Sequence, residues 1–191
     1  TISVVDASSN DNFDSVADQT LSATTTDDDV AGFTIVESDG STEVDESGTT
    51  DTFTVVLDAE PNSDVVLTIS SDDTGEATVT NALTFSSANW DTPQTITITG
   101  ADESILDGNQ DTTITVTIDD ANSDNNFDSV ADQTISATTT DDDVAGFTIV
   151  ESDGSTEVAE SGTTDTFTIV LDAQPSSNVV VAMSSSDTGE A

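Results

Sequence analysis

The chain has 191 residues, of which 40 are Asp or Glu and none is Lys, Arg or His, so its formal net charge is −40 at pH 7. Without those residues and without Cys, it has no nucleophile–base pair, no Schiff-base lysine and no imidazole or thiolate ligand for zinc, and we do not expect an enzyme. Nucleic acid and anionic membrane surfaces are bound through cationic side chains, so we expect no nucleic-acid partner and no direct membrane binding.

The chain is a repeat with a period of about 114 residues. Residues 1–77 return as 115–191, with about 60 of the 77 positions identical. A boundary placed after the Asp triplet predicts three segments: the C-terminal part of a first repeat (1–29), a complete repeat (30–143) and the N-terminal part of a third (144–191). The complete repeat has the size of a domain.

Within the complete repeat, apolar residues alternate with a period of two, which indicates strands with one buried face. In chain order the predicted strands are Phe33–Glu37, Thr52–Leu57, Asp64–Ser70, Thr78–Phe85, Thr95–Thr99, Thr112–Ile118 and Gln133–Thr139. The residues expected to point inward are Phe53, Val55, Leu57, Val65, Leu67, Ile69, Ile96, Ile98, Ile114, Val116 and Ile118. About seven short strands separated by turns rich in Gly, Asp, Asn and Ser predict an all-β, immunoglobulin-like antiparallel sandwich, repeated in tandem.

Acidic residues gather in connections that this fold places at one end. With strands labelled A to G, the A–B, C–D and E–F loops and the exit of strand G all face the next repeat. The acids at these places are Glu43, Asp45, Glu46, Asp72, Asp73, Glu76, Asp102, Glu103, Asp107, Asp111, Asp141, Asp142 and Asp143. Oxygen ligands without imidazole or thiolate favour Ca²⁺, which takes six to eight oxygens, so we predict Ca²⁺ as the cofactor.

Three of these features resemble the Calx-beta family of calcium-binding sandwich domains: Glu46-Ser47-Gly48 opening a strand, the acidic E–F loop, and the closing Asp triplet. The stretches Ser70–Glu76, Leu83–Trp90 and Pro93–Gly100 are similar to the tandem Calx-beta-like repeats of large bacterial surface proteins. The resemblance covers the whole repeat and implies that Ca²⁺ is held by Glu46, Asp102, Glu103, Asp141, Asp142 and Asp143. It also implies an extracellular, adhesin-type location.

Further ligand candidates follow from the cluster and from the repeat. Asp73 and Asp107 lie in the same acidic loops, and Asp27, Asp28, Asp29 and Glu160 are the counterparts of the triplet and of Glu46. Since Asp45 becomes Ala159 while Glu46 is kept as Glu160, Glu46 is the preferred ligand of that pair.

The F–G loop is a weaker candidate site. Asp120, Asn122 and Asp124 have the spacing of oxygen ligands with which an EF-hand loop begins, but the terminal Glu of such a loop is missing. A plain solvated turn is the alternative.

These observations predict a calcium-binding repeat that forms a rigid stalk or fibre segment, with neighbouring repeats of the same chain as partners through calcium-bridged junctions. One alternative is a self-assembling matrix or sheath filament with lateral association. A glycan-binding module is less favoured, because only Trp90 offers a platform for a sugar. A glycosidase would require a carboxylate pair in a cleft, which acids carried on turns do not suggest.

Overall fold

The computed structural model describes residues 1–80 and 82–189. It separates into two compact units, Thr1–Val30 and Ala31–Ala191, which are described one at a time. Among the described residues, no helix is long and apolar enough to cross a membrane.

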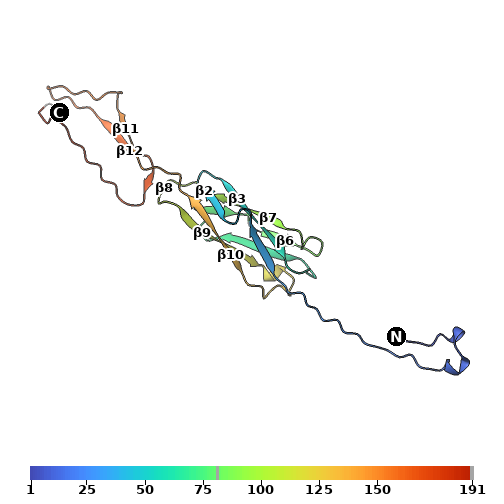
Figure 1. Cartoon of the computed structure of the whole chain (residues 1–191). Helices are drawn as coiled ribbons and strands as arrows, with labels where there is room; N and C mark the ends of the chain where they lie inside the picture. Colours follow the sequence, from blue (N-terminus) through green and yellow to red (C-terminus); the bar gives the residue numbers. More distant parts are fainter. Residues whose placement is uncertain (81, 190–191) are drawn as a thin grey trace. The chain divides into compact units, whose positions relative to one another are not determined.

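Two sheets form the body of the larger unit (Figure 1). The first has the order β1-β3-β7-β5, with β1 at Phe33–Glu37, β3 at Thr50–Leu57, β7 at Gln94–Gly100 and β5 at Ala77–Val79. The second has the order β2-β10-β9-β4-β6, with β2 at Thr42–Asp45, β10 at Gln133–Thr140, β9 at Gln110–Ile118, β4 at Val65–Ser71 and β6 at Ala82–Phe85. All neighbours are antiparallel except β2, which runs parallel to β10. This order corresponds to the A-B-E-D and G-F-C sheets of an immunoglobulin-like sandwich.

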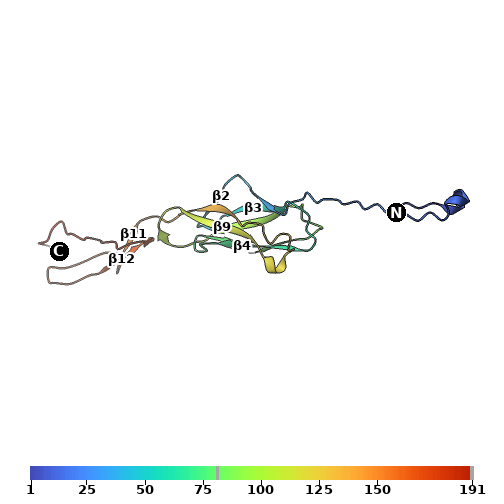
Figure 2. The ribbon, with the colours of Figure 1, turned by 90° about the horizontal axis from the view of Figure 1, so that it is seen from below.

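The core lies between these sheets, which Figure 2 shows from below. All eleven residues that the sequence predicts to point inward are buried. Phe85 and Phe127 are also buried and fill the space that the aliphatic residues leave. The prediction of an all-β sandwich is therefore confirmed, while nothing in the structure tests the predicted repeat boundaries.

The strands of these two sheets differ from the prediction in two places. The sequence suggested no strand at β2, because a four-residue segment with two acids reads as a turn; its pairing with β10, about 95 residues away, makes it a strand. The predicted strand Thr78–Phe85 is two strands: β5 pairs with β7 in the first sheet, and β6 pairs with β4 in the second. The chain thus crosses between the sheets, and Asn81 of that prediction lies outside the described residues.

A second hairpin follows the sandwich. Its strands are β11 (Phe147–Glu151) and β12 (Phe167–Leu171), and Phe147 pairs with Leu171 as Phe33 pairs with Leu57 in β1 and β3. Two further short segments, β8 (Ile105–Leu106) and β13 (Gln174–Pro175), pair in parallel.

The smaller unit, Thr1–Val30, has two 3-10 turns, η1 (Asp6–Ser8) and η2 (Asp11–Phe13). A single antiparallel bridge joins Ile2 to Gln19. The sandwich contains the equivalent pair, Val116 and Gln133, and has its own 3-10 turn η3 (Asp120–Asn122). The local pairing therefore recurs in both places.

Candidate metal centre

The alternation of buried and less buried side chains along β2 places Glu46 inside the protein. Thr42 and Val44 face the core, and Glu46 continues the same side one step beyond the strand. Its backbone N–H donates to the Thr140 carbonyl at 3.2 Å, which keeps the parallel pairing with β10 for one more residue. The side chain is 0 % exposed, and neither carboxylate oxygen has a hydrogen-bond partner among the described residues. A buried carboxylate with no partner is costly unless it takes up a proton or binds a cation.

Gly100 lets the turn that carries Glu46 approach the end of β7. A Cβ added at Gly100 would collide with the backbone carbonyl oxygen of Asp45, and the Gly100 N–H donates to the Thr49 carbonyl at 3.0 Å. Gly48, at φ 88°, provides the left-handed residue that the turn requires. The location of Glu46 therefore depends on two glycines as well as on β2.

Two groups of acids share Glu46. In each group, one oxygen from every member lies within 4.8 Å of one from each of the others. The first group is Glu46, Glu103 and Asp107, and the second is Glu46, Asp141 and Asp143. The E–F loop supplies the first partners and the exit of β10 supplies the second. These clusters could hold a metal ion.

Hydrogen bonds to some of these carboxylates hold the loops in place. Glu103 accepts the Ile105 N–H with Oε2 at 3.0 Å, and its Oε1 is buried without a partner among the described residues. Asp141 accepts the Gly108 N–H at 2.7 Å and the Asp143 N–H at 2.8 Å. Asp143 Oδ2 is also buried and without a partner among these residues. Unpaired oxygens of Glu46, Glu103 and Asp143 therefore remain for a ligand.

The electrostatic setting disfavours ionisation of Glu46 and Asp143. Burial raises the pKa of Glu46 to about 7, and the charges of Asp141, Glu103 and Glu76 add to the rise. The N–H of Asp142 is directed toward the carboxylate and offsets part of this pKa shift, although no hydrogen bond of ordinary geometry forms. Burial also raises the pKa of Asp143, as do the charges of Asp141, Asp142 and Asp102.

Glu76, in the C–D turn, lies near these clusters, since its charge contributes to the raised pKa of Glu46. The sequence placed it among the converging acids but not among the ligands, because no motif marks it. Its Oε2 is buried without a partner among the described residues, and burial, followed by the charges of Asp107, Asp73, Glu103 and Asp141, raises its pKa. Its carbonyl accepts hydrogen bonds from the Ala101 N–H at 2.8 Å and the Thr139 hydroxyl at 3.2 Å, so the turn is tied to both sheets.

Asp45 has a different role from its neighbour Glu46. Its carboxylate accepts the Ser47 hydroxyl and, at 3.0 Å, the Ser47 N–H. The Ser47 hydroxyl is the main reason why the pKa of Asp45 is lowered, and burial opposes it. This carboxylate stabilises its own turn, which favours Glu46 as the ligand of the pair.

The remaining acids of the predicted set lie at the edge of the cluster. Asp73, Asp102 and Asp142 are exposed, and Asp73 accepts the Gly75 N–H of its own turn at 2.9 Å. Their charges nevertheless act on the buried groups, Asp73 on Glu76 and Asp102 and Asp142 on Asp143.

In the F–G loop, the carboxylate of Asp124 accepts hydrogen bonds from the backbone. The buried carboxylate of Asp124 accepts the N–H groups of Asn62 at 2.6 Å, Ser63 at 3.1 Å and Asn126 at 2.9 Å, and these bonds, that from Asn126 foremost, lower its pKa. Asp120 and Asn122 are exposed, and the Asn122 amide donates to Asp119 at 2.8 Å. This geometry explains Asp124 as a link between the F–G and B–C loops without a metal.

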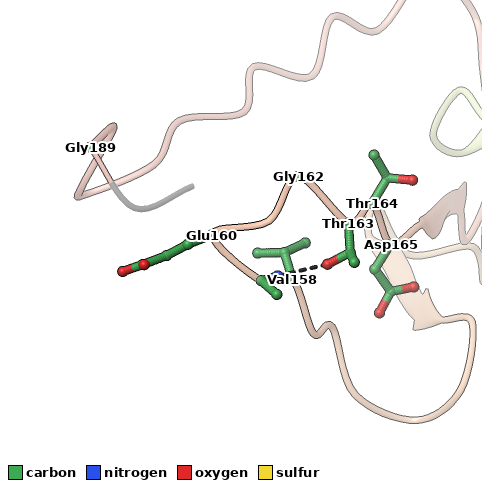
Figure 3. A pocket seen from close by; sticks show the side chains of 8 residues that line it. Val158, Glu160, Gly162, Thr163, Thr164, Asp165 and Gly189 are labelled. Atoms are coloured by element: carbon green, nitrogen blue, oxygen red, sulfur yellow. Dashed lines mark hydrogen bonds between the residues drawn. The ribbon is translucent and has the colours of Figure 1, made fainter.

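The counterparts of the site residues in the other copies lie apart from any such cluster among the described residues. Asp27, Asp28 and Asp29 are exposed, although Asp27 accepts the Asp29 N–H at 3.1 Å as Asp141 accepts that of Asp143. Glu160 is exposed and extends away from Thr163 and Asp165 at the rim of a hollow of about 520 Å³ (Figure 3). The local turn is preserved, but the buried carboxylate is not.

Comparisons with known proteins identify no family. No family model matches the chain, that of the Calx-beta domains included, and no curated protein matches it. Among solved structures, the E. coli chaperone DraB is similar with a TM-score of 0.41 and 10% identity over 61% of this chain, which spans 59% of that chain. Domains 1–6 of the surface layer protein SbsC are similar with a TM-score of 0.38 and 16% identity, over 79% of this chain and 23% of that chain. The MSP-like protein SSP-19 of Caenorhabditis elegans is similar with a TM-score of 0.35 and 16% identity, over 53% of this chain and 92% of that chain. Likeness this distant assigns no function.

Proposed function

We propose that this chain is a calcium-binding structural segment of a long extracellular protein, in which Ca²⁺ at the acidic end of the sandwich stiffens the molecule. The single observation that carries the proposal is Glu46: a fully buried carboxylate that is shared by two groups of acids and whose two oxygens have no hydrogen-bond partner in the part of the chain that the structure describes. Because the chain has no Lys, Arg or His, the charge that would compensate this group comes from outside it.

Calcium suits the donor set better than other common cations. The candidate ligands are carboxylate oxygens carried by three separate connections, and Ca²⁺ accepts six to eight oxygens in a flexible geometry. Mg²⁺ demands a near-ideal octahedron and retains water, and Zn²⁺ favours His and Cys ligands. Glu46 belongs to both acid groups, and either group could hold an ion.

The proposed role follows from the position of the site. The exit of β10, which bears Asp141 and Asp143, leads directly into the second hairpin. Ca²⁺ bound there would fix the short connection between consecutive repeats and produce a stalk, as the Calx-beta resemblance of the sequence implies. In this proposal the repeat is a spacer without enzymatic activity, and its partners are its own neighbours in the chain.

Thermal unfolding of the whole chain tests the proposal. Unfolding is followed by circular dichroism in EDTA, in millimolar Ca²⁺ and in millimolar Mg²⁺. A ligand at 100 times its Kd that binds only the folded state adds about 2.7 kcal/mol, which corresponds to roughly 10 °C or more for a domain of about 100 residues. We expect such a rise in Ca²⁺ and a much smaller one in Mg²⁺.

Equal midpoints in the three buffers would overturn calcium binding. The acids would then serve only to keep the chain solvated, and lateral self-association into a filament would become the leading proposal. Electron micrographs of the same samples distinguish single rods from ordered bundles.

A further inference from the structure

The short strand β8 (Ile105–Leu106) lies between two candidate ligands. Glu103 precedes it and Asp107 follows it, and both belong to the group centred on Glu46. Because successive side chains of an extended segment point to opposite sides, Leu106 faces away from the side on which Asp107 lies. One loop thus has a side toward the cation site and a side away from it.

The conformation of this loop depends on the acids. The Ile105 N–H donates to Glu103 Oε2 at 3.0 Å, and the Gly108 N–H donates to Asp141 Oδ2 at 2.7 Å. No strand of the two main sheets pairs with β8 among the described residues. The carboxylates that offer oxygens to a cation are therefore the same groups that shape β8.

The other side of the loop contacts the second hairpin. Ile105 pairs with Gln174 and Leu106 with Pro175 in parallel, and the Gln174 N–H donates to the Ser104 carbonyl at 2.6 Å. Leu106 also lines an apolar cavity of about 360 Å³, together with Phe147, Leu171, Pro175 and Val179. These contacts join the E–F loop of the sandwich to the turn that follows β12.

We infer that Ser104–Leu106 is a docking segment for the following repeat, with Leu106 as its apolar contact, and that a cation held by Glu103, Asp107 and Glu46 controls this docking. The inference rests on the proposed function for its cation, and it extends that function by naming the segment that transmits binding to the next repeat. The linker after β10 is then not the only connection that calcium stiffens.

The physical basis is repulsion between the acids. Like charges held close together away from bulk water repel one another strongly. Without a cation, repulsion among these acids therefore favours an open loop, and β8 loses the shape that pairs with β13. A bound cation reverses the sign of this interaction and holds the loop closed.

The absence of Cys from the chain allows a direct test. Two cysteines are introduced at exposed threonines, Thr68 on β4 and Thr168 on β12, and are spin-labelled. Distance distributions are measured by pulsed electron paramagnetic resonance in EDTA and in Ca²⁺, and calcium binding to the same proteins is measured by calorimetry. The variants are Leu106→Asp and the matched control Val36→Asp, which changes an exposed apolar residue on β1.

We expect Ca²⁺ to narrow the distribution in the parent protein and in Val36→Asp. In Leu106→Asp the narrow component should be lost while calorimetry still detects calcium binding, weakened by the factor by which docking and binding are coupled. A distribution in Leu106→Asp that narrows as it does in the control would overturn the docking segment even though calcium binds. If calorimetry detects no calcium binding to the parent, both the proposed function and the cation control fail. The distributions in EDTA then show by themselves whether Leu106 makes the contact.

Discussion

The hairpins β1–β3 and β11–β12 have nearly the same sequence and the same local hydrogen bonds, but they differ in burial. Asp51 accepts the Ser38 hydroxyl and the Glu43 and Thr52 N–H groups, and Asp165 accepts the equivalent three groups. Phe33 is 3 % exposed and Phe147 is 54 % exposed, and Glu46 is buried where Glu160 is exposed. Pairing and turn geometry are thus properties of the segment, whereas burial is not.

The difference identifies what creates the candidate site. Glu46 has a raised pKa because β10, the E–F loop and the C–D turn surround it. No such elements surround Glu160 among the described residues. A carboxylate in a closely similar turn is therefore an ordinary surface acid in one copy and a candidate ligand in the other. Matched substitutions in the two copies test this reading.

The largest expected difference between the two hairpins is in how much a Phe→Ala substitution lowers the free energy of unfolding. Phe53→Ala should lower the free energy of unfolding of the sandwich by about 3–5 kcal/mol, because it empties a fully buried site. Phe167→Ala should change it by less than about 0.5 kcal/mol, because Phe167 is 42 % exposed. The single tryptophan, Trp90, packs against the sandwich core, so its fluorescence during denaturant unfolding reports on the sandwich. Equal losses in the two variants would show that the second hairpin shares the core.

Calcium affinity should respond next. Changes that only reorient a metal ligand weaken binding about 10- to 100-fold, so Glu46→Gln, which removes a buried charge at the centre of both acid groups, should weaken it at least as much. Glu160→Gln should leave the tightest binding step unchanged. Isothermal titration calorimetry on the full chain measures both affinities, and equal affinities would remove Glu46 from the site.

The pH dependence of stability without calcium should distinguish the same pair. The pKa of Glu46 is about 7 in the folded protein against an ordinary value of 4.5, so between these pH values the folded state binds more protons than the unfolded state. The stabilisation is complete below pH 4.5 and is lost as the pH rises through about 7. Thermal midpoints in EDTA should therefore fall across this range.

Glu46→Gln should reduce the fall of the thermal midpoint with pH, and Glu160→Gln should leave this fall unchanged. Glu76 and Asp143, whose pKa values are also raised, contribute in the same direction, so part of the pH dependence should remain in Glu46→Gln. Asp51 and Asp124 act oppositely, since their pKa values are lowered and their stabilisation is lost only in more acidic solution. A midpoint that rises with pH in EDTA would contradict a buried Glu46 whose pKa is raised.

The smallest expected effects should be alike in the two hairpins. Burial by itself would raise the pKa of Asp51, but the donors of Glu43, Thr52 and Ser38 outweigh it and lower the pKa. The Glu157 N–H is the largest cause of the same lowering at Asp165. Asp51→Asn and Asp165→Asn should each weaken their turn by about 1 kcal/mol. Faster hydrogen exchange at the Glu43 and Glu157 amides measures this, and an effect on only one of them would show that the turns are not equivalent.

Much of the fold could be predicted because each strand carries its own pattern. The alternation in β3, β4, β7 and β9 correctly assigned every residue predicted to face the core. The strand β2 could not be found in this way, since a short acidic segment becomes a strand only beside β10. The crossing of the chain between β5 and β6 was also missed, because alternation does not say in which sheet a strand pairs.

The candidate site could be predicted as a gathering of acids but not as a set of ligands. The loop order of an immunoglobulin-like sandwich was enough to bring Glu46, Glu103, Asp107, Asp141 and Asp143 to one end. It could not show that Glu76 joins them with a buried oxygen, or that Asp124 bonds to the backbone of the B–C loop. Both depend on contacts between loops that lie far apart in the sequence.

Residue types and near neighbours in the chain account for the similarity between residues 1–77 and 115–191, for the strand pattern and for the lack of any cationic side chain that could neutralise the acids. The tertiary structure alone decided which carboxylates lose contact with water and which stay solvated. The pKa and the ligand capacity of an acid depend on burial and on charges brought near by distant strands, and the closely similar turns hold a buried carboxylate at Glu46 and an exposed one at Glu160.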